Sequence, residues 1–246
     1  LYSFRTIELF FCSYYLKHCK KMKNHITLFL LIATNFFYAQ SITTEKIEDF
    51  YKIKVYNGIR LELIRSNENK IEITGTKANK VKIKNIEGVL KVSLRFPELL
   101  AGDKVSVKLF YNKDIQTIDG NEGSKIIGRD INQTHLEVKA QEGASINLEI
   151  NTKHLKVKSI SGSVVQLTGK SKNQDVELDL YGVYQGYGLQ ASNSSTIKAG
   201  TGSKAEVNAG ETLFAKVSFG GSILYKGDPE VIKNKKTAGG IIKQMN

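Results

Sequence analysis

The stretch YGVYQGYG, residues 181–188, contains the side chains best suited to bind a sugar. Tyr181, Tyr184 and Tyr187 alternate there with glycines. An exposed aromatic ring can stack on the apolar face of a pyranose, and tyrosine adds a polar tip for a hydroxyl group. These three tyrosines are the predicted ligand-binding residues. The alternative is that their rings fill an irregular turn or stack between neighbouring repeats.

Two histidines occur in matching phrases, THLEVK and KHLKVK. His135 and His154 are 19 residues apart, and we expect them to lie about 5 Å apart on adjacent strands if one structural repeat separates them. A metal site usually needs three or four ligands, and no further histidine occurs after residue 40. The pattern predicts a surface ladder, with no metal ion and no other cofactor.

The residues that could act in catalysis do not form a recognisable set. Glu177 and Asp179 are two residues apart in VELDL, so they share one face of a strand, whereas a glycosidase needs two carboxyl groups on either side of a bond. Ser222 has no G-x-S-x-G motif around it. We therefore predict no catalytic residues and no enzymatic activity.

The elements that carry these residues repeat along the second half of the chain. A glycine in a small-residue turn recurs every 19 or 20 residues, at Gly123, Gly143, Gly162, Gly182, Gly202, Gly221 and Gly240. Each repeat holds two strand-like pieces, and glycine is suited to the turn because it reaches a positive φ without a Cβ clash. Repeats of this size bury their apolar faces by stacking. Residues 116–243 are thus predicted to form a parallel β-helix of about six coils.

A different pattern covers residues 45–115. Apolar and polar residues alternate there without a helical period; Val105, Val107 and Leu109, for example, share one face. The predicted fold is all-β, a sheet-forming first section that merges into the β-helix. A pair of antiparallel sheets with Gly-Ser hairpin turns is the alternative, and ladders of like residues at the repeat spacing would exclude it.

The first residues have the layout of an export signal. Residues 22–39 combine a basic start, an apolar run and a small residue at Ala39, as in a secretory signal peptide. Residues 1–21 are interpreted as an upstream extension, and they contain both cysteines of the chain. The expected mature protein has no disulfide and no transmembrane segment, and it is placed in the periplasm or on the cell surface.

Lysine dominates the charge of the chain. The net charge is +12, and removing the five basic residues and one acidic residue of positions 1–39 leaves +8. Lysine is a solvated point charge, less suited than arginine to bidentate phosphate recognition. We interpret the excess as a solvated face or as weak attraction to anionic lipid or polysaccharide. The export signal argues against nucleic acid as a partner.

Several phrases together resemble a known family. FYKIKVYNGIRLELI at 50–64, the repeated Gly-Ser turns and SFGGSILYKGDPEV at 218–231 are similar to the head GIN domain family of adhesins from Bacteroidetes-type bacteria. The resemblance covers residues 46–243. It implies a right-handed β-helix-like superhelix without a recognised catalytic set, and a role in adhesion. The stretch at 181–188 departs from the Gly-Ser pattern.

Three functions remain open from the sequence. The first is a non-catalytic envelope or surface protein that binds a glycan or another envelope component through its repetitive β surface. The second is a structural envelope protein that self-associates as a homo-oligomer, and the third is a divergent polysaccharide-active enzyme. An exposed tyrosine patch would favour the first, and a self-complementary apolar face the second. A cleft with two or more acids from different coils would favour the third.

Overall fold

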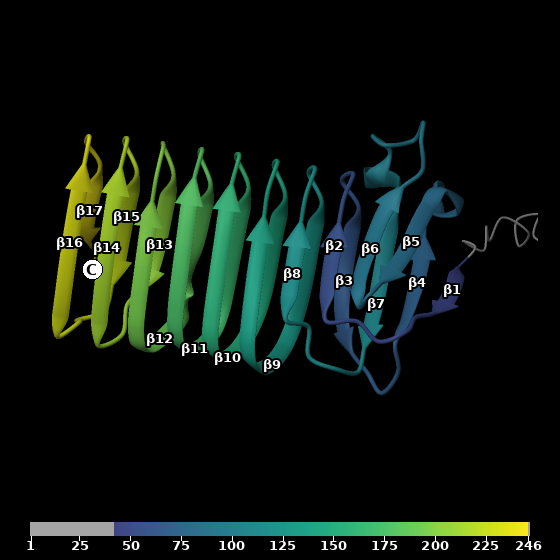
Figure 1. Ribbon diagram of the computed structural model, residues 1–246, viewed down its shortest axis with the longest axis horizontal. Coiled ribbons are helices and arrows are strands. Elements are labelled where there is room, and N and C mark those ends of the chain that lie inside the picture. Colours follow the sequence, from purple (N-terminus) through teal and green to yellow (C-terminus); the bar gives the residue numbers. More distant parts are fainter. Residues whose placement is uncertain (1–41, 246) are drawn as a thin grey trace, which may run out of the picture. The chain divides into compact units, whose positions relative to one another are not determined.

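The structure is a computed structural model, and it describes residues 42–245. The predicted upstream extension and signal peptide lie outside these residues. Within the described part, residues 42–245 belong to one compact unit, which is an elongated stack of β-strand coils (Figure 1). Its secondary structure is almost entirely strand, as the sequence predicts.

Seventeen strands form one continuous sheet that winds into the coils. The strands of the first section are β1 (Thr43–Lys46), β2 (Lys52–Val55), β3 (Arg60–Arg65), β4 (Lys70–Thr74), β5 (Val81–Ile86), β6 (Val89–Leu94) and β7 (Ser106–Tyr111). The later strands are β8 (Thr117–Gly120), β9 (Lys125–Ala140), β10 (Ser145–Ile160), β11 (Val164–Asp179), β12 (Val183–Ala199), β13 (Lys204–Asn208), β14 (Thr212–Ser218), β15 (Ser222–Lys226), β16 (Val231–Thr237) and β17 (Ile241–Gln244). Two single-turn 3₁₀ helices, Ala78–Lys80 and Gly102–Lys104, lie in the connections.

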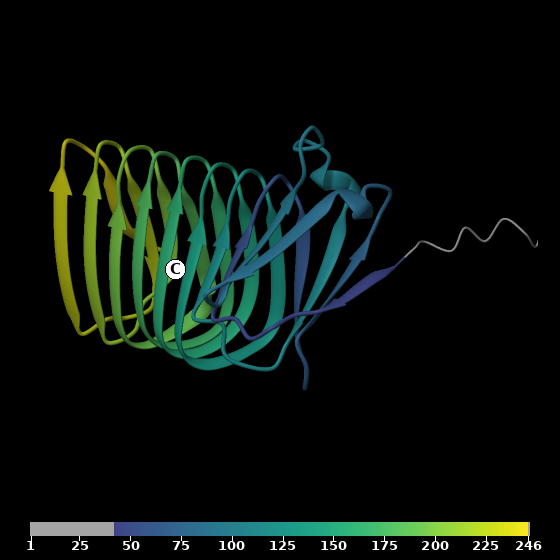
Figure 2. The ribbon, with the colours of Figure 1, turned by 45° about the vertical axis from the view of Figure 1, so that its right-hand side comes forward.

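The repeat predicted from the glycine spacing is a coil of this solenoid. Strands β9 to β12 each run through a corner, so that their first halves stack on one side of the coil and their second halves on the other (Figure 2). We call the side made by the second halves, together with β2, β6, β8, β14 and β16, the front face. The opposite side, made by the first halves with β3, β7, β13, β15 and β17, is the back face.

Parallel pairing at the repeat spacing confirms the predicted β-helix and excludes the antiparallel alternative for residues 116–243. Val138 pairs with Val157, Val157 with Val176 and Val176 with Ile197, all of them buried. Stacking such residues produces a continuous apolar interior, because one coil cannot cover its own inner face. The solenoid has about seven turns at roughly 19-residue spacing.

The first section contributes coils of its own, in addition to those of residues 116–243. Strand β2 pairs in parallel with both β6 and β8, while β3 pairs in parallel with both β7 and β9. The coil β6–β7 therefore lies beyond β2–β3, although it comes later in the sequence. Strands β4 and β5 pair antiparallel with β7 and β6, and β1 pairs antiparallel with β4. These antiparallel strands extend the sheet at that end, where Ile71 and Ile73 of β4 are buried.

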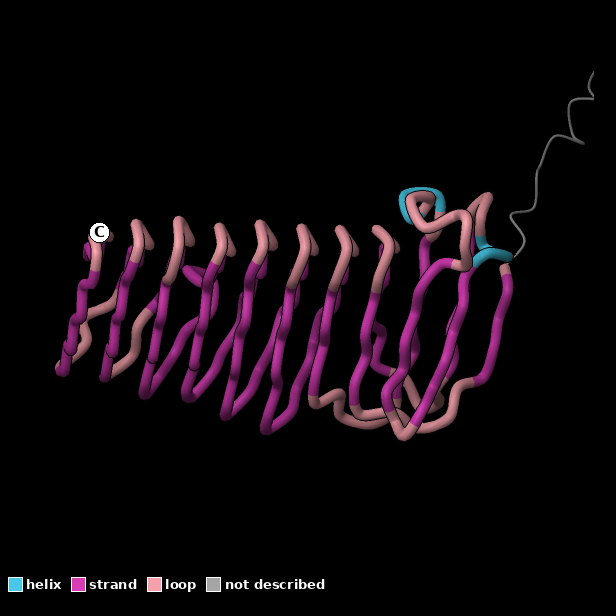
Figure 3. The backbone as a smooth tube through the Cα atoms, turned by 45° about the horizontal axis from the view of Figure 1, so that its top comes forward, coloured by secondary structure: helices cyan, strands magenta, loops and turns pink. Residues whose placement is uncertain are grey.

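The tight turns stack in register along one edge of the molecule (Figure 3). In the turn at Glu142 and Gly143 both residues have a positive φ, of 55° and 74°, which is the geometry of a type I′ turn. The Gly143 N–H donates to the carbonyl of Ser161 in the next coil at 3.0 Å. Each turn thereby holds the following turn in place.

The seven predicted turn glycines occupy two different positions. Gly123, Gly143, Gly162 and Gly202 are the second residue of their turns and have positive φ values. Gly182, Gly221 and Gly240 come one residue later in theirs, and of these three only Gly240 has a positive φ, of 123°. A Cβ on Gly182 would lie 2.0 Å from the Ser159 carbonyl oxygen, and Tyr181 takes the positive φ of 65° in that turn. The reason for glycine at 182 is therefore close packing, not the left-handed φ that the spacing predicted.

Candidate functional site

The structure separates the three tyrosines that the sequence placed in one binding surface. Tyr184 is fully buried, and its hydroxyl donates to Gln174 Oε1 at 3.0 Å. Gln174 Nε2 in turn donates to Ser195 Oγ at 2.9 Å. Burial raises the pKa of the Tyr184 phenol. Tyr184 therefore belongs to a polar network inside the solenoid. This burial corrects the prediction that its ring lies on a ligand-binding surface.

The other two tyrosines lie on different surfaces. Tyr181 is 67% exposed and lies on the edge of the molecule where the tight turns stack, with its ring over Gly202. Tyr187 is half-buried on the back face, where the Lys226 ammonium lies 5.2 Å from its ring centroid. Because strand alternation sends Tyr184 inward, the residues of YGVYQGYG do not form a continuous stacking platform.

The histidine pair forms the predicted ladder. His135 and His154 pair in register on β9 and β10, with ring centroids 4.9 Å apart and an interplanar angle of 14°. They line a shallow trough of about 490 Å³ on the front face together with Asn173 and Ser194. Within residues 42–245, no group of three or more His, Cys, Asp or Glu side chains is placed to hold a metal ion.

The two acids of VELDL have different surroundings. Glu177 is exposed on the front face. Asp179 caps the turns, since its Oδ1 accepts the backbone N–H groups of Leu180 and Thr201, each at 2.9 Å. Ser222 lies on β15 of the back face, away from both. Nothing in this arrangement joins the three residues in a catalytic set.

A larger hollow, of about 790 Å³, lies on the back face. We call it the notch. Its principal polar lining residues are Glu62, Arg65, Arg129, Asp130, Asn147, Glu149 and Thr168. These residues come from strands β3, β9, β10 and β11, so the notch crosses several coils.

Strand divergence at a β-bulge forms the notch. Strand β3 pairs with β9 only from Arg60 to Leu63, whereas its pairing with β7 continues to Arg65. At that point β9 contains an extra residue relative to β10, and Asp130 has a φ of 54°. Such bulges bend a strand and redirect its side chains. Here the bulge places Arg129 and Asp130 at the rim of the space that opens beside the end of β3.

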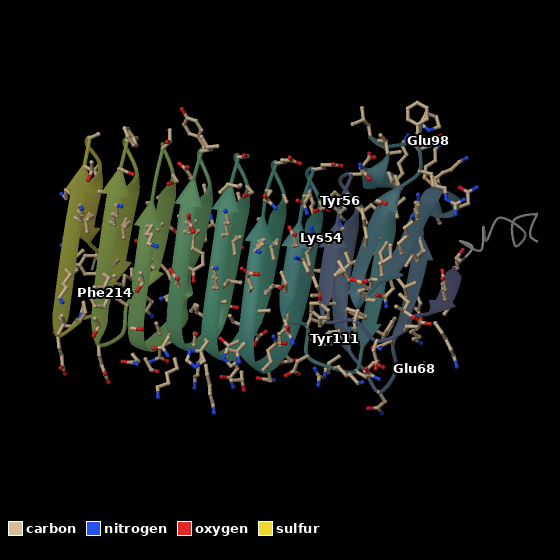
Figure 4. All side chains as sticks on the ribbon, viewed as in Figure 1. Lys54, Tyr56, Glu68, Glu98, Tyr111 and Phe214 are labelled. Atoms are coloured by element: carbon tan, nitrogen blue, oxygen red, sulfur yellow. The ribbon has the colours of Figure 1, made fainter. Side chains whose placement is uncertain are left out.

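The charges of the notch are partly fixed by neighbouring groups. Arg65 Nη1 lies 3.2 Å from Asp114 Oδ1, and its guanidinium lies 5.3 Å from the ring centroid of Tyr111. Tyr111 is buried near the base of the coils (Figure 4). Burial raises the pKa of Tyr111, and the Arg65 charge opposes part of that increase. Arg129 is exposed and forms no ion pair with any residue in 42–245.

The notch can hydrogen-bond a polar ligand from several directions. Guanidinium groups supply donors, carboxylates supply acceptors, and Asn147 and Thr168 supply both. Ile64 and Ile127 add an apolar border. A hydroxyl-rich molecule requires this mixture of donors, acceptors and apolar contact.

Comparison with known proteins identifies the family. The profile described as "Putative auto-transporter adhesin, head GIN domain" matches residues 49–229. The chain belongs to the head GIN domain family. No protein of curated function matches the sequence.

Solved structures share the fold of this head GIN domain. A "putative adhesin" from Bacteroides fragilis superposes with a TM-score of 0.75 at 18% identity, covering 85% of this chain and 98% of the other. A "putative adhesin" from Parabacteroides merdae gives a TM-score of 0.64 at 19% identity, with the same coverage. A "putative lipid binding protein" from Parabacteroides distasonis gives 0.62 at 16% identity, also with 85% and 98% coverage.

The described part of this head GIN domain contains no helix of the length and apolarity needed to cross a membrane. Sequence reasoning missed the notch, because its residues are spread over more than 100 positions and belong to no motif. One signal was available. Gly123 and Gly143 are 20 residues apart, whereas Gly143 and Gly162 are 19 apart, and the longer repeat contains the β9 bulge.

Proposed function

We propose that this protein is an exported, non-catalytic adhesin that binds a glycan or another envelope component on its solenoid surface, with the notch as the principal site. The observation that carries the proposal is the notch itself. It is larger than the trough beside the histidines, and it combines an unpaired arginine, acidic and amide side chains and an apolar border. Family membership and the names of the structural neighbours, which describe them as adhesins, support the same role.

The notch meets the condition set for the enzyme alternative, a cleft with two or more acids from different coils. Glu62, Asp130 and Glu149 line it from three strands. A carboxylic acid that protonates a leaving group is kept protonated at neutral pH by a water-poor site. Asp130 and Glu149 are solvent-exposed, which favours ligand binding over acid catalysis.

A glycan array with neutral and acidic oligosaccharides tests the binding site. We expect the protein comprising residues 41–246 to bind a subset of the glycans, and Arg129→Ala to weaken that binding about tenfold through loss of charge-assisted hydrogen bonds. Arg60→Ala is the matched control, because Arg60 is exposed on the same face but outside the notch. Equal binding by Arg129→Ala and the unchanged protein would place the ligand elsewhere.

Protease shaving of intact cells tests the location. Adhesion to another cell requires residues 41–246 to be digested from outside, while a periplasmic marker remains intact. If the protein is protected until the outer membrane is breached, direct cell adhesion is wrong and a periplasmic binding role replaces it.

Self-association is the second candidate function. Two copies would have to meet at an edge of the sheet, such as the end of the solenoid formed by β16 and β17. Strands β16 and β17 pair only with β14 and β15 among the described strands, and Val231, Ile232 and Ile241 are exposed there. Asn234 and Lys236 stand in register with the buried Ala215 and Val217. Inward-pointing polar residues and lysines on an edge strand oppose pairing with another copy. Sedimentation should therefore show a monomer, whereas a concentration-dependent oligomer would favour a structural role.

A further inference from the structure

One row of outward side chains on the front face is strongly basic. Pairing in register places nine residues in a single ladder across the coils: Lys91, Lys54, Asp119, Lys139, Lys158, Glu177, Lys198, Lys216 and Lys235. Seven of the nine are lysines. Because neighbouring strands lie about 4.8 Å apart, the row is about 40 Å long. We call it the lysine ladder.

The back face offers a direct comparison. Its ladder across the same coils contains Lys108, Glu62, Ile127, Asn147, Gln166, Gln185, Glu206, Leu224 and Lys243. Two lysines are balanced there by two glutamates, so the row has no net charge. The other outward row of the back face contains Arg60, Lys125 and Lys204 and no acid, so its net charge is +3. The lysine ladder, with seven lysines and two acids, is more basic than either of these two rows.

Part of the ladder is neutralised within the protein. Lys54 Nζ lies 3.6 Å from the buried Asp119 carboxylate, and Lys139 Nζ lies 3.0 Å from Glu137. The last three lysines differ. Lys198, Lys216 and Lys235 are exposed, directly adjacent to one another, and form no ion pair with any residue in 42–245. Like charges directly opposite on neighbouring strands are destabilising, so this arrangement favours a ligand that supplies the missing negative charge.

We propose that the lysine ladder binds a linear anionic polysaccharide that lies along the row, with its carboxylates opposite successive coils. An extended uronic acid polymer has one carboxylate per sugar, and its sugar-to-sugar repeat is close to the strand spacing. Repeated weak contacts of this kind add up over a chain. Phe214 on the neighbouring row is 37% exposed, with Lys233 Nζ 5.4 Å from its ring centroid, and its ring offers a surface on which a sugar can stack.

A membrane surface fits the observations less well. Peripheral binding to a bilayer is strengthened by apolar side chains that insert beside the basic ones. On the front face the large exposed apolar residues near the ladder are Phe214 and, at the last coil, Val231 and Ile232. The charge forms a narrow row along the solenoid rather than a basic patch with an apolar centre. Figure 4 shows Lys54 and Phe214 toward opposite ends of the row of coils.

Two triple variants test the proposal. The first, Lys198→Gln with Lys216→Gln and Lys235→Gln, removes three charges from the ladder. The second, Lys108→Gln with Lys125→Gln and Lys243→Gln, removes three exposed charges from the back face. Binding of residues 41–246 and of both variants to polygalacturonate, to methyl-esterified polygalacturonate and to vesicles containing phosphatidylglycerol is measured at two salt concentrations. Thermal unfolding verifies that both variants fold.

The unchanged protein should bind polygalacturonate more tightly than its neutral ester, and more weakly as salt increases. The ladder variant should lose about tenfold or more in affinity, and the back-face variant little. Equal losses in the two variants, or binding to vesicles without binding to polygalacturonate, would overturn the proposal. The ladder variant should keep the binding to neutral glycans that Arg129→Ala weakens, because its three lysines lie outside the notch. Failure of the notch and failure of the ladder therefore give different results.

Discussion

Lys54 on β2 and Asp119 on β8 form an ion pair between the first section of the chain and the repeats, with Nζ 3.6 Å from Oδ2. Asp119 also accepts hydrogen bonds from Asn121 Nδ2 at 3.0 Å and from Gln141 Nε2 at 3.3 Å. The carboxylate is almost fully buried. This network joins segments separated by more than 60 residues, so the first section and the repeats form one continuous solenoid.

Asp119→Asn should destabilise the fold. The substitution removes the negative charge that faces Lys54 and leaves the network with an extra donor, and we expect a loss of about 2 kcal/mol in the free energy of unfolding. Glu177→Gln is the matched control, because Glu177 is exposed on the same ladder and should change stability by less than about 0.5 kcal/mol. Chemical denaturation measures both. Similar losses in the two variants would show that the buried network adds no more to the free energy of unfolding than an exposed charge does.

Gln174→Ala tests the internal polar network. Without the Gln174 amide, the Tyr184 hydroxyl loses its acceptor and Ser195 loses a donor, while a small cavity forms in the interior. We expect a loss of about 3 kcal/mol. Gln166→Ala, on the exposed back face, should be close to neutral. A neutral Gln174→Ala would mean that water readily replaces the amide.

Two glycine substitutions separate backbone conformation from packing. A Cβ on Gly143 meets no atom within 4 Å, so Gly143→Ala should cost about 1 kcal/mol through its φ of 74° alone. Gly182→Ala should cost more than about 2 kcal/mol, because its Cβ would overlap the Ser159 carbonyl oxygen and the coil must shift. Thermal or urea unfolding shows which of the two variants is less stable. A larger loss for Gly143→Ala than for Gly182→Ala would contradict the roles given to the two glycines.

Glu137 should make stability depend on acidic pH. Burial alone would raise the pKa of Glu137, but the hydrogen bond from Lys139 and the charges of Lys139 and Lys156 outweigh it and hold the pKa below its usual value. A lowered folded-state pKa contributes stability that is present above the unfolded pKa and lost as pH falls through the folded pKa. Unfolding measured from pH 6 downward should therefore show a loss of stability below about pH 4.5, and Glu137→Gln should have a shallower loss. Identical pH profiles for the two proteins would exclude this role.

Local patterns alone predicted much of the fold. The alternation of apolar and polar residues identified strands, and the recurrence of glycine every 19 or 20 residues identified the coils. The spacing of His135 and His154 also predicted a stacked pair, which the ring separation of 4.9 Å confirms. These inferences succeeded because a solenoid repeats the same local interactions between neighbours, so sequence period and spatial period coincide.

Other features depended on contacts that the period does not encode. Strand alternation was visible at 181–188, but only the tertiary structure showed that Tyr184 faces inward to Gln174. The order of the first coils could not be read either, since β6–β7 lies beyond β2–β3 although it follows them in the chain. The notch arises where β3 leaves β9 at a bulge, a long-range divergence between strands.

The sequence by itself determined the strand content, the coil length and the stacking of His135 on His154, because these follow from side-chain alternation and from a regular repeat. The tertiary structure decided which outward positions face one another where the register shifts at a bulge and in the first section of the chain. It thereby collected the lysines into one row and the polar residues of the notch into one hollow. The physical reason is register: a single inserted residue at a bulge changes which side chains become neighbours, while the local pattern on either side stays the same.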